Sequence, residues 1–130
     1  YRCGTGHSVS FVGNVHEGPH ALNGRNTTLM RPGMIVTDEP GVYETNLVGI
    51  RIENELVCVH KADNQYGTFL GFEPIMFVPI ATSPIVPGVL TKDELDWLNN
   101  YHRQVFEKLA SRLNDEEREW LAKKCAAIGC

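Results

Sequence analysis

Two carboxylates in the first half of the sequence are suited to binding a divalent metal ion. Glu39 and Glu53 each lie within or at the end of an apolar stretch. An ionised carboxylate in such a stretch is unfavourable unless a partner group or a cation stabilises it. If residues 34–39 and 49–59 pair as antiparallel strands, the two glutamates come close together on one face, where a divalent cation would relieve their repulsion.

A structural ion pair is the alternative to a metal site. Arg51 lies two residues before Glu53 and could neutralise the carboxylates without any metal. The spacing of the residues supports both interpretations equally. The histidines carry the same ambiguity, because a single His7, His16 or His20 is more often a hydrogen-bonded surface residue than a ligand.

Composition narrows the class of protein. The 130 residues are 42% hydrophobic and 22% charged, with a formal net charge of −4, which is typical of a globular domain. A basic surface for nucleic acid is not expected, and no apolar run approaches the about 20 residues that a membrane span requires. The four cysteines form no C-x-x-C pair, so we expect reduced thiols in a cytoplasmic protein.

Hydrophobic periodicity divides the chain into a β-rich part and a helical part. The expected strands cover residues 8–12, 28–30, 34–37, 49–60 and 69–79, with a loop at 61–68 between the last two. Such an antiparallel sheet of about four strands has no helix of its own before residue 91. We therefore expect the sheet to be poorly covered.

The last part of the sequence predicts a helical hairpin. Thr91 and Glu94 have the spacing of a capping box, and apolar residues at helical intervals follow as far as Leu113. Asn114 and Glu117 repeat the capping pattern for a second helix.

The sequence also predicts the structure of the segment that connects the two parts and the positions of the aromatic residues in the helices. Residues 82–88 contain two prolines and are expected to form a linker. Trp97 and Tyr101 lie at helical spacing, which favours a place in the helical core over a role in a ligand cage. Trp120 belongs to the apolar set of the second helix.

Five short motifs occur in an order that resembles one family closely. They are GTGH at 4–7, NVHEGP at 14–19, PGM at 32–34, TDEPG at 37–41 and GIRIEN at 49–54. With DWLNNYH at 96–102, they resemble the metallopeptidase domain and the C-terminal extension of the aminopeptidase P (Xaa-Pro aminopeptidase) family.

The resemblance implies an α+β fold. Residues 1–80 would form the C-terminal half of the family's pita-bread metallopeptidase domain, which is built on an antiparallel sheet. Residues 81–130 would form the C-terminal extension, a helical hairpin.

The resemblance also implies a site that holds two divalent metal ions, with manganese expected and zinc or cobalt as the alternatives. The family's ligands are two aspartates, one histidine and two glutamates. His7, Glu39 and Glu53 match the histidine and the glutamates, and Glu53 would bridge both ions. No aspartate precedes His7, so the two aspartates are expected in a missing N-terminal portion of the enzyme. The chain alone is therefore expected to be inactive.

Further roles follow from the same resemblance. A metal-activated water would hydrolyse the N-terminal peptide bond before proline. Glu39 would position and deprotonate this water, and His16 would contact the substrate carbonyl. Arg51 would hold Glu53 or line the proline pocket. Cys3 stands where many relatives have a histidine that lines the substrate site.

The expected partners are peptides with proline at the second position, the missing N-terminal portion, and a second copy bound through the helical hairpin. Two other functions remain open: a prolidase (Xaa-Pro dipeptidase) fragment, or a catalytically inert protein-interaction module. Residues 96–102 favour the aminopeptidase over the prolidase. The presence of His7, Glu39 and Glu53 argues against an inert module.

Overall fold

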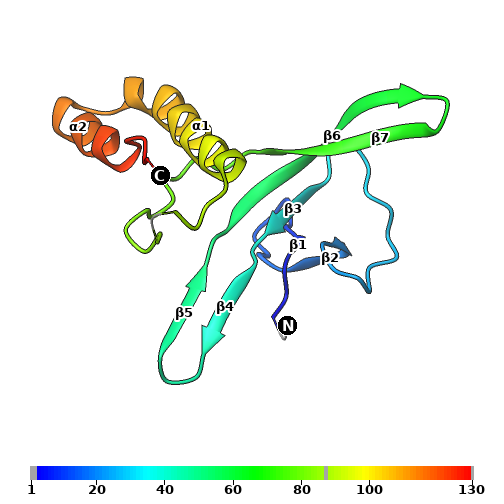
Figure 1. Cartoon of the computed structure of the whole chain (residues 1–130). Helices are drawn as coiled ribbons and strands as arrows, with labels where there is room; N and C mark the ends of the chain where they lie inside the picture. Colours follow the sequence, from blue (N-terminus) through cyan, green and yellow to red (C-terminus); the bar gives the residue numbers. More distant parts are fainter. Residues whose placement is uncertain (1–2, 87, 130) are drawn as a thin grey trace. The chain divides into compact units, whose positions relative to one another are not determined.

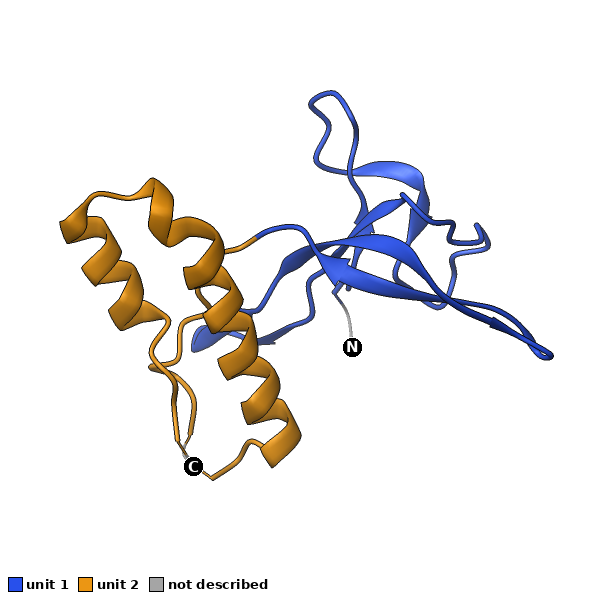
Figure 2. Ribbon diagram, turned by 90° about the horizontal axis from the view of Figure 1, so that it is seen from above, with its two compact units in different colours: residues 1–76 blue, residues 77–130 orange. Residues whose placement is uncertain are grey.

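The computed structural model describes residues 3–86 and 88–129. The chain divides into two compact units, residues 1–76 and residues 77–130 (Figure 2). The first unit is made of strands and the second of helices (Figure 1). This order confirms the predicted antiparallel sheet followed by a helical hairpin.

The first unit contains a five-stranded antiparallel sheet and a separate two-stranded ribbon. The strands are β1 (His7–Ser8), β2 (Glu17–Ala21), β3 (Ile35–Asp38), β4 (Gly41–Glu44), β5 (Val48–Arg51), β6 (Asn54–Asn64) and β7 (Gly67–Pro74). The sheet order is β2-β1-β3-β6-β7, and the ribbon pairs β4 with β5. The short strand β3 thus lies at the centre, between β1 and β6.

The β4–β5 ribbon continues the register of the β3–β6 pair. Asp38 pairs with Asn54 in the sheet, and Gly41 pairs with Arg51 in the ribbon. Asp38 and Gly41 are separated by as many residues as Arg51 and Asn54 are, so the register is unbroken across the gap. Pro40 lies in this gap and has no N–H to donate to a ladder, which accounts for the interruption.

The strand predicted over residues 49–60 is therefore two strands, and the loop predicted at 61–68 is wrong. Strand β6 runs on to Asn64, and a tight turn leads into β7 at Gly67. The polar residues here are exposed on a two-stranded hairpin, where cross-strand pairs stabilise them. One such pair joins Lys61 Nζ to Glu73 Oε1 at 2.7 Å.

Three shorter predictions also need correction. The strand expected at 8–12 is limited to His7–Ser8, the one at 28–30 does not form, and the one at 69–79 ends at Pro74. Strand β2 was missed because it contains a glycine and Pro19. It is an edge strand, where proline is tolerated because its missing N–H faces solvent.

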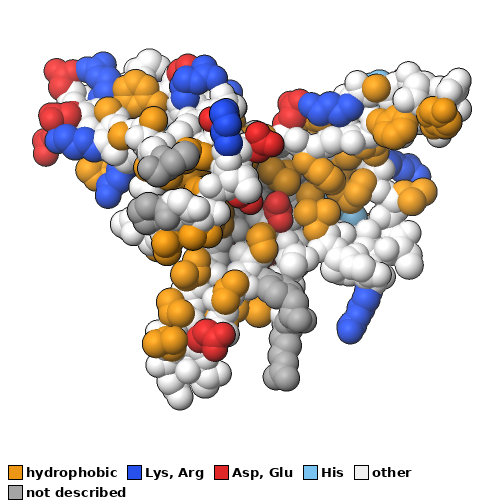
Figure 3. Space-filling view, viewed as in Figure 1, with side chains coloured by type: hydrophobic (Ala, Val, Ile, Leu, Met, Phe, Trp, Pro, Cys, Tyr) orange, Lys and Arg blue, Asp and Glu red, His pale blue; other side chains and the backbone are white. Residues whose placement is uncertain are grey.

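Many large apolar side chains of the first unit are exposed. Among its described residues only Val36 and Cys58 are buried apolar side chains. Along the β4–β5 ribbon, Val42, Val48 and Ile50 remain between 46% and 66% exposed, and Figure 3 shows apolar side chains along this ribbon. The sheet is thus as poorly covered as the sequence predicts.

Both helices of the second unit begin at the predicted caps. Helix α1 (Lys92–Leu109) is capped by Thr91 and helix α2 (Asp115–Lys124) by Asn114, each in a complete capping box. A 3-10 turn at Ala110–Arg112 ends the first helix earlier than predicted. In the described part of the chain, no helix is long and apolar enough to cross a membrane.

Tyr101, Val105 and Leu121 form the core of the helical unit. The predicted core position of Tyr101 is confirmed, but that of Trp97 is wrong. Trp97 is 61% exposed and stacks on Tyr101 with ring centroids 5.7 Å apart. Trp120 is also 56% exposed.

Two predictions reach residues that the structure does not describe. The linker at 82–88 contains no helix or strand in its described residues, and Pro87 lies outside them. Cys3, Cys58 and Cys125 are free in the described part of the chain, while Cys130 lies outside the described residues.

Helix α1 binds the extended segment that precedes it through two ring side chains. The Tyr101 hydroxyl donates to the Val78 carbonyl at 3.0 Å, and the backbone N–H of Ile80 donates to His102 Nε2 at 3.0 Å. His102 is fully buried. Burial lowers the pKa of His102 below its ordinary value, so the ring is neutral in the folded unit.

This buried histidine predicts a pH-dependent stability. The unfolded chain takes up a proton at His102 near its ordinary pKa of about 6.5, while the folded unit stays neutral to lower pH. The free energy of unfolding should therefore be constant above that value and fall as the pH drops through it. Replacement His102→Gln keeps an acceptor for Ile80 and should remove this part of the pH dependence.

Tryptophan fluorescence during urea unfolding measures the effect, because both tryptophans, Trp97 and Trp120, lie in the helical unit. Unfolding midpoints are compared at about pH 7.5 and about pH 5.5, on either side of the ordinary histidine pKa. An equal decrease for the wild type and for His102→Gln would show that His102 does not contribute.

Candidate metal centre

The Glu39 carboxylate is contacted from several segments of the first unit. Its backbone N–H donates to the carbonyl of Thr5 at 2.9 Å, which fixes Glu39 beside the segment that enters β1. One carboxylate oxygen, Oε1, lies 2.9 Å from His7 Nε2. The other, Oε2, pairs with the guanidinium of Arg51. Because the side chain is only 14% exposed, these polar partners replace much of its hydration.

Thr37 connects the histidine and the glutamate. Its hydroxyl accepts a hydrogen bond from the His7 backbone N–H at 3.0 Å and donates one to Glu39 Oε1 at 2.9 Å. Thr37 and Glu39 are two residues apart, a spacing that directs strand side chains to the same face. The backbone of His7, the hydroxyl, the carboxylate and the imidazole therefore form a closed ring of polar contacts.

The hydrogen bonds of His7 suit it to metal binding. Nδ1 lies 2.9 Å from the Ser8 carbonyl, which can only accept, so Nδ1 carries a proton. Nε2 then faces Glu39 Oε1 at 2.9 Å. A histidine ligand held at its other ring nitrogen is the usual arrangement at metal sites. The His16 ring lies beside the His7 ring, with the centroids 4.2 Å apart and the planes tilted by 39°.

The β4–β5 ribbon holds Arg51 in place against Glu39. Arg51 Nε donates to the Tyr43 hydroxyl at 2.6 Å, and its guanidinium carbon lies 5.5 Å from the centre of that ring. Gly49 pairs with Tyr43 across the ribbon, and a Cβ at Gly49 would lie 2.8 Å from the ring. The ion pair considered as the alternative to a metal is thus present at Glu39.

The structure brings four of the six predicted site residues together, namely His7, His16, Glu39 and Arg51. Glu53 is exposed, and the unbroken register places its backbone opposite Glu39. Cys3 lines a separate pocket. Within residues 3–86 and 88–129 there is no group of three histidine, cysteine or acidic side chains that could hold a metal ion.

Two residues of the site were missed by the sequence interpretation, Thr37 and Tyr43. The signal for Thr37 was available, since it stands two residues before Glu39 on a strand. The signal for Tyr43 was its place across from Gly49, because an aromatic ring often covers a cross-strand glycine. That position requires the register of the ribbon, which spacing alone does not provide.

Comparison with known proteins shows that the chain belongs to metallopeptidase family M24. Residues 1–60 match that family, and residues 68–128 match the C-terminal region of peptidase M24. The chain is 46% identical to aminopeptidase P2 of Arabidopsis thaliana, over 93% of this chain and 18% of that protein. It is 43% identical to aminopeptidase P1 of Lotus japonicus, over 99% of this chain and 20% of that protein.

A solved structure shows the same relationship. It is the X-prolyl aminopeptidase of Caenorhabditis elegans, described as a cytosolic enzyme with a di-nuclear active site. It matches this chain with a TM-score of 0.83 and 39% identity, over 96% of this chain and 21% of that one. The predicted fold class and family resemblance are confirmed. The chain spans about a fifth of the length of these relatives.

The Thr37 hydroxyl gives a testable prediction. Replacement Thr37→Val removes the donor that orients the Glu39 carboxylate and the acceptor that holds the His7 backbone. We expect the affinity of the chain for a divalent ion to fall by about tenfold or more, as is usual when a residue that orients metal ligands is lost. Isothermal titration calorimetry with manganese measures the change.

The conservative variant Thr37→Ser keeps the hydroxyl and should retain the wild-type affinity. Thr45→Val serves as the matched control, because Thr45 is exposed in the turn of the β4–β5 ribbon. Wild-type affinity in Thr37→Val would mean that the hydroxyl does not orient the ligands.

Proposed function

We propose that this chain forms part of a metal-dependent Xaa-Pro aminopeptidase, which hydrolyses the N-terminal peptide bond before proline. The observation that carries the proposal is the contact between His7 Nε2 and Glu39 Oε1 at 2.9 Å, in a chain of the M24 metallopeptidase family. Relatives named aminopeptidase P support the choice of substrate.

His7, Glu39 and Glu53 would hold two divalent ions, together with two aspartates from polypeptide outside residues 1–130. The orientation of His7 fits this role, because its Nδ1 proton is used on Ser8 and leaves Nε2 to bind. Glu53 would contribute its carboxylate from the position opposite Glu39. Manganese is the expected metal, with zinc or cobalt as the alternatives. When bound, the ions would lower the pKa of a shared water and polarise the scissile carbonyl.

The protein side chains would then direct the hydrolysis. Glu39 accepts the proton of the attacking water, whose oxygen adds to the carbonyl carbon before proline. The C–N bond breaks and the proline nitrogen receives the proton that Glu39 took up, which releases the first residue and a shortened peptide. His16 stabilises the negative charge that develops on the carbonyl oxygen. Arg51, held by Tyr43, keeps Glu39 oriented.

Further parts of the proposal concern partners and location. The substrates are peptides with proline at the second position. The helical unit, residues 77–130, would provide the contact of a homodimer through its exposed side chains, Trp97 among them. A cytoplasmic location is proposed because the C. elegans neighbour is described as cytosolic.

Cleavage of Ala-Pro-Ala with added manganese tests the proposal. The 130-residue chain is compared with a longer form that includes the segment expected to carry the two aspartates. We expect cleavage by the longer form only, because three ligands leave the metal site incomplete. In the longer form, Glu53→Ala should reduce cleavage to the rate of the peptide without enzyme, since the bridging ligand is lost.

Glu44→Ala is the matched control, because Glu44 is an exposed carboxylate on the same ribbon. Cleavage by the 130-residue chain alone would show that the aspartates are not needed. Cleavage of dipeptides alone would indicate a prolidase. No cleavage of any proline peptide by the longer form would leave a protein-interaction module as the function.

A further inference from the structure

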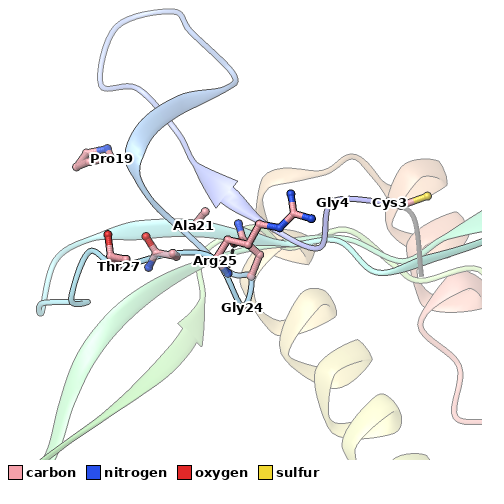
Figure 4. A pocket seen from close by; sticks show the side chains of 9 residues that line it. Cys3, Gly4, Pro19, Ala21, Gly24, Arg25 and Thr27 are labelled. Carbon is pink, nitrogen blue, oxygen red and sulfur yellow. Dashed lines mark hydrogen bonds between the residues drawn. The ribbon is translucent and has the colours of Figure 1, made fainter.

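A polar pocket lies beside the candidate metal centre. Its volume is about 790 Å³, within the range of small-molecule sites. One wall is the segment of Cys3 and Gly4, and the other is the loop at 23–27 (Figure 4). Strand β2 contributes Ala21 to the lining.

The pocket and the candidate centre share backbone. Ala21 pairs with His7 between β2 and β1. Gly4 is followed directly by Thr5, whose carbonyl accepts the N–H of Glu39. The pocket and the candidate centre are therefore adjacent along the chain and across the β1–β2 pair.

Among the described residues of the lining, Arg25 carries the one charged side chain. Figure 4 shows it extending from the loop toward Gly4. In the described part of the chain no carboxylate pairs with Arg25, and none lines the pocket. An arginine guanidinium can bind a carboxylate through two parallel hydrogen bonds, so the pocket favours a ligand that carries this group.

Hydrogen bonds within the loop hold Arg25 in position. Asn23 Oδ1 accepts the backbone N–H of Arg25 at 2.9 Å. Asn26 binds Thr28 twice, with its Nδ2 donating to the carbonyl at 2.8 Å and its Oδ1 accepting the N–H at 3.2 Å. Such side-chain turns fix the backbone locally, which reduces the entropy lost when a ligand binds.

We propose that this pocket binds the part of the peptide that follows the cleaved bond, and that Arg25 pairs with a carboxylate there. The inference rests on the proposed aminopeptidase function. Removal of one residue from a tripeptide leaves a dipeptide whose C-terminal carboxylate lies two residues from the reacting bond. An acidic side chain at the third position of a longer peptide offers the same group.

The test compares kcat/KM in the longer form for Ala-Pro-Ala, for its C-terminal amide, and for Ala-Pro-Asp amide. We expect the free acid to be cleaved about tenfold better than the amide, because one charge-assisted pair is lost. Arg25→Ala should remove this preference, and Arg25→Lys should keep part of it. The arm with Ala-Pro-Asp amide shows whether a side-chain carboxylate replaces the terminal one.

Arg31→Ala is the matched control. Arg31 is an exposed arginine six residues further along the chain and does not line the pocket, so its loss should leave the preference unchanged. Equal cleavage of acid and amide by the wild type, or an unchanged preference in Arg25→Ala, would overturn the role of Arg25. Either result leaves the aminopeptidase function in place.

If the longer form cleaves none of the peptides, the aminopeptidase function fails. Peptide binding then tests separately whether the pocket takes a carboxylate. The side-chain N–H signal of Arg25 is then followed by NMR in the 130-residue chain as each peptide is added. A shift with Ala-Pro-Ala but not with its amide supports a carboxylate site. The absence of such a shift overturns it.

Discussion

The contacts of the Glu39 carboxylate hold together the parts of the first unit that form the candidate site. An ionised carboxylate with 14% exposure requires partners, and it finds them on segments far apart in the sequence. The imidazole of His7 comes from β1, the hydroxyl of Thr37 from β3 and the guanidinium of Arg51 from β5. The contacts of His7 and Arg51 fix β1 and β5 relative to the end of β3, so the sheet and the ribbon are joined at this group.

The interruption between the sheet and the ribbon makes this arrangement possible. Pro40 cannot donate to a ladder, so pairing stops after Asp38 and resumes at Gly41 with the same register. The same register places the backbones of Glu39 and Glu53 opposite one another at the gap. Like charges directly opposite across two strands repel, and the structure separates their environments: Glu39 is held by polar partners, while Glu53 is exposed. A cation bound as proposed would be coordinated by both carboxylates, Glu39 and Glu53.

The two units depend on different forces. The helical unit has its own apolar core and two complete capping boxes, and its ring side chains bind the preceding segment by hydrogen bonds. The strand unit buries few apolar residues in its described part and depends more on backbone pairing and on the polar contacts around Glu39. The proposed functional groups lie in the strand unit, where neighbouring polypeptide in a longer protein could complete the site and cover the exposed apolar side chains.

The sequence by itself determined the elements that depend on local pattern: the two caps, the helical periodicity and the central strand. The resemblance to the family predicted His7 and Glu39 as ligands, and the structure places these two side chains in contact. It failed at residues 61–68, because polar side chains on an exposed hairpin have the composition of a loop. Only the tertiary structure decided that Thr37 joins His7 to Glu39, that Tyr43 holds Arg51, and that Arg25 enters a pocket beside β2. Each of these contacts joins residues on different strands or in a folded loop, so it depends on register and backbone geometry, which side-chain spacing along one chain does not specify.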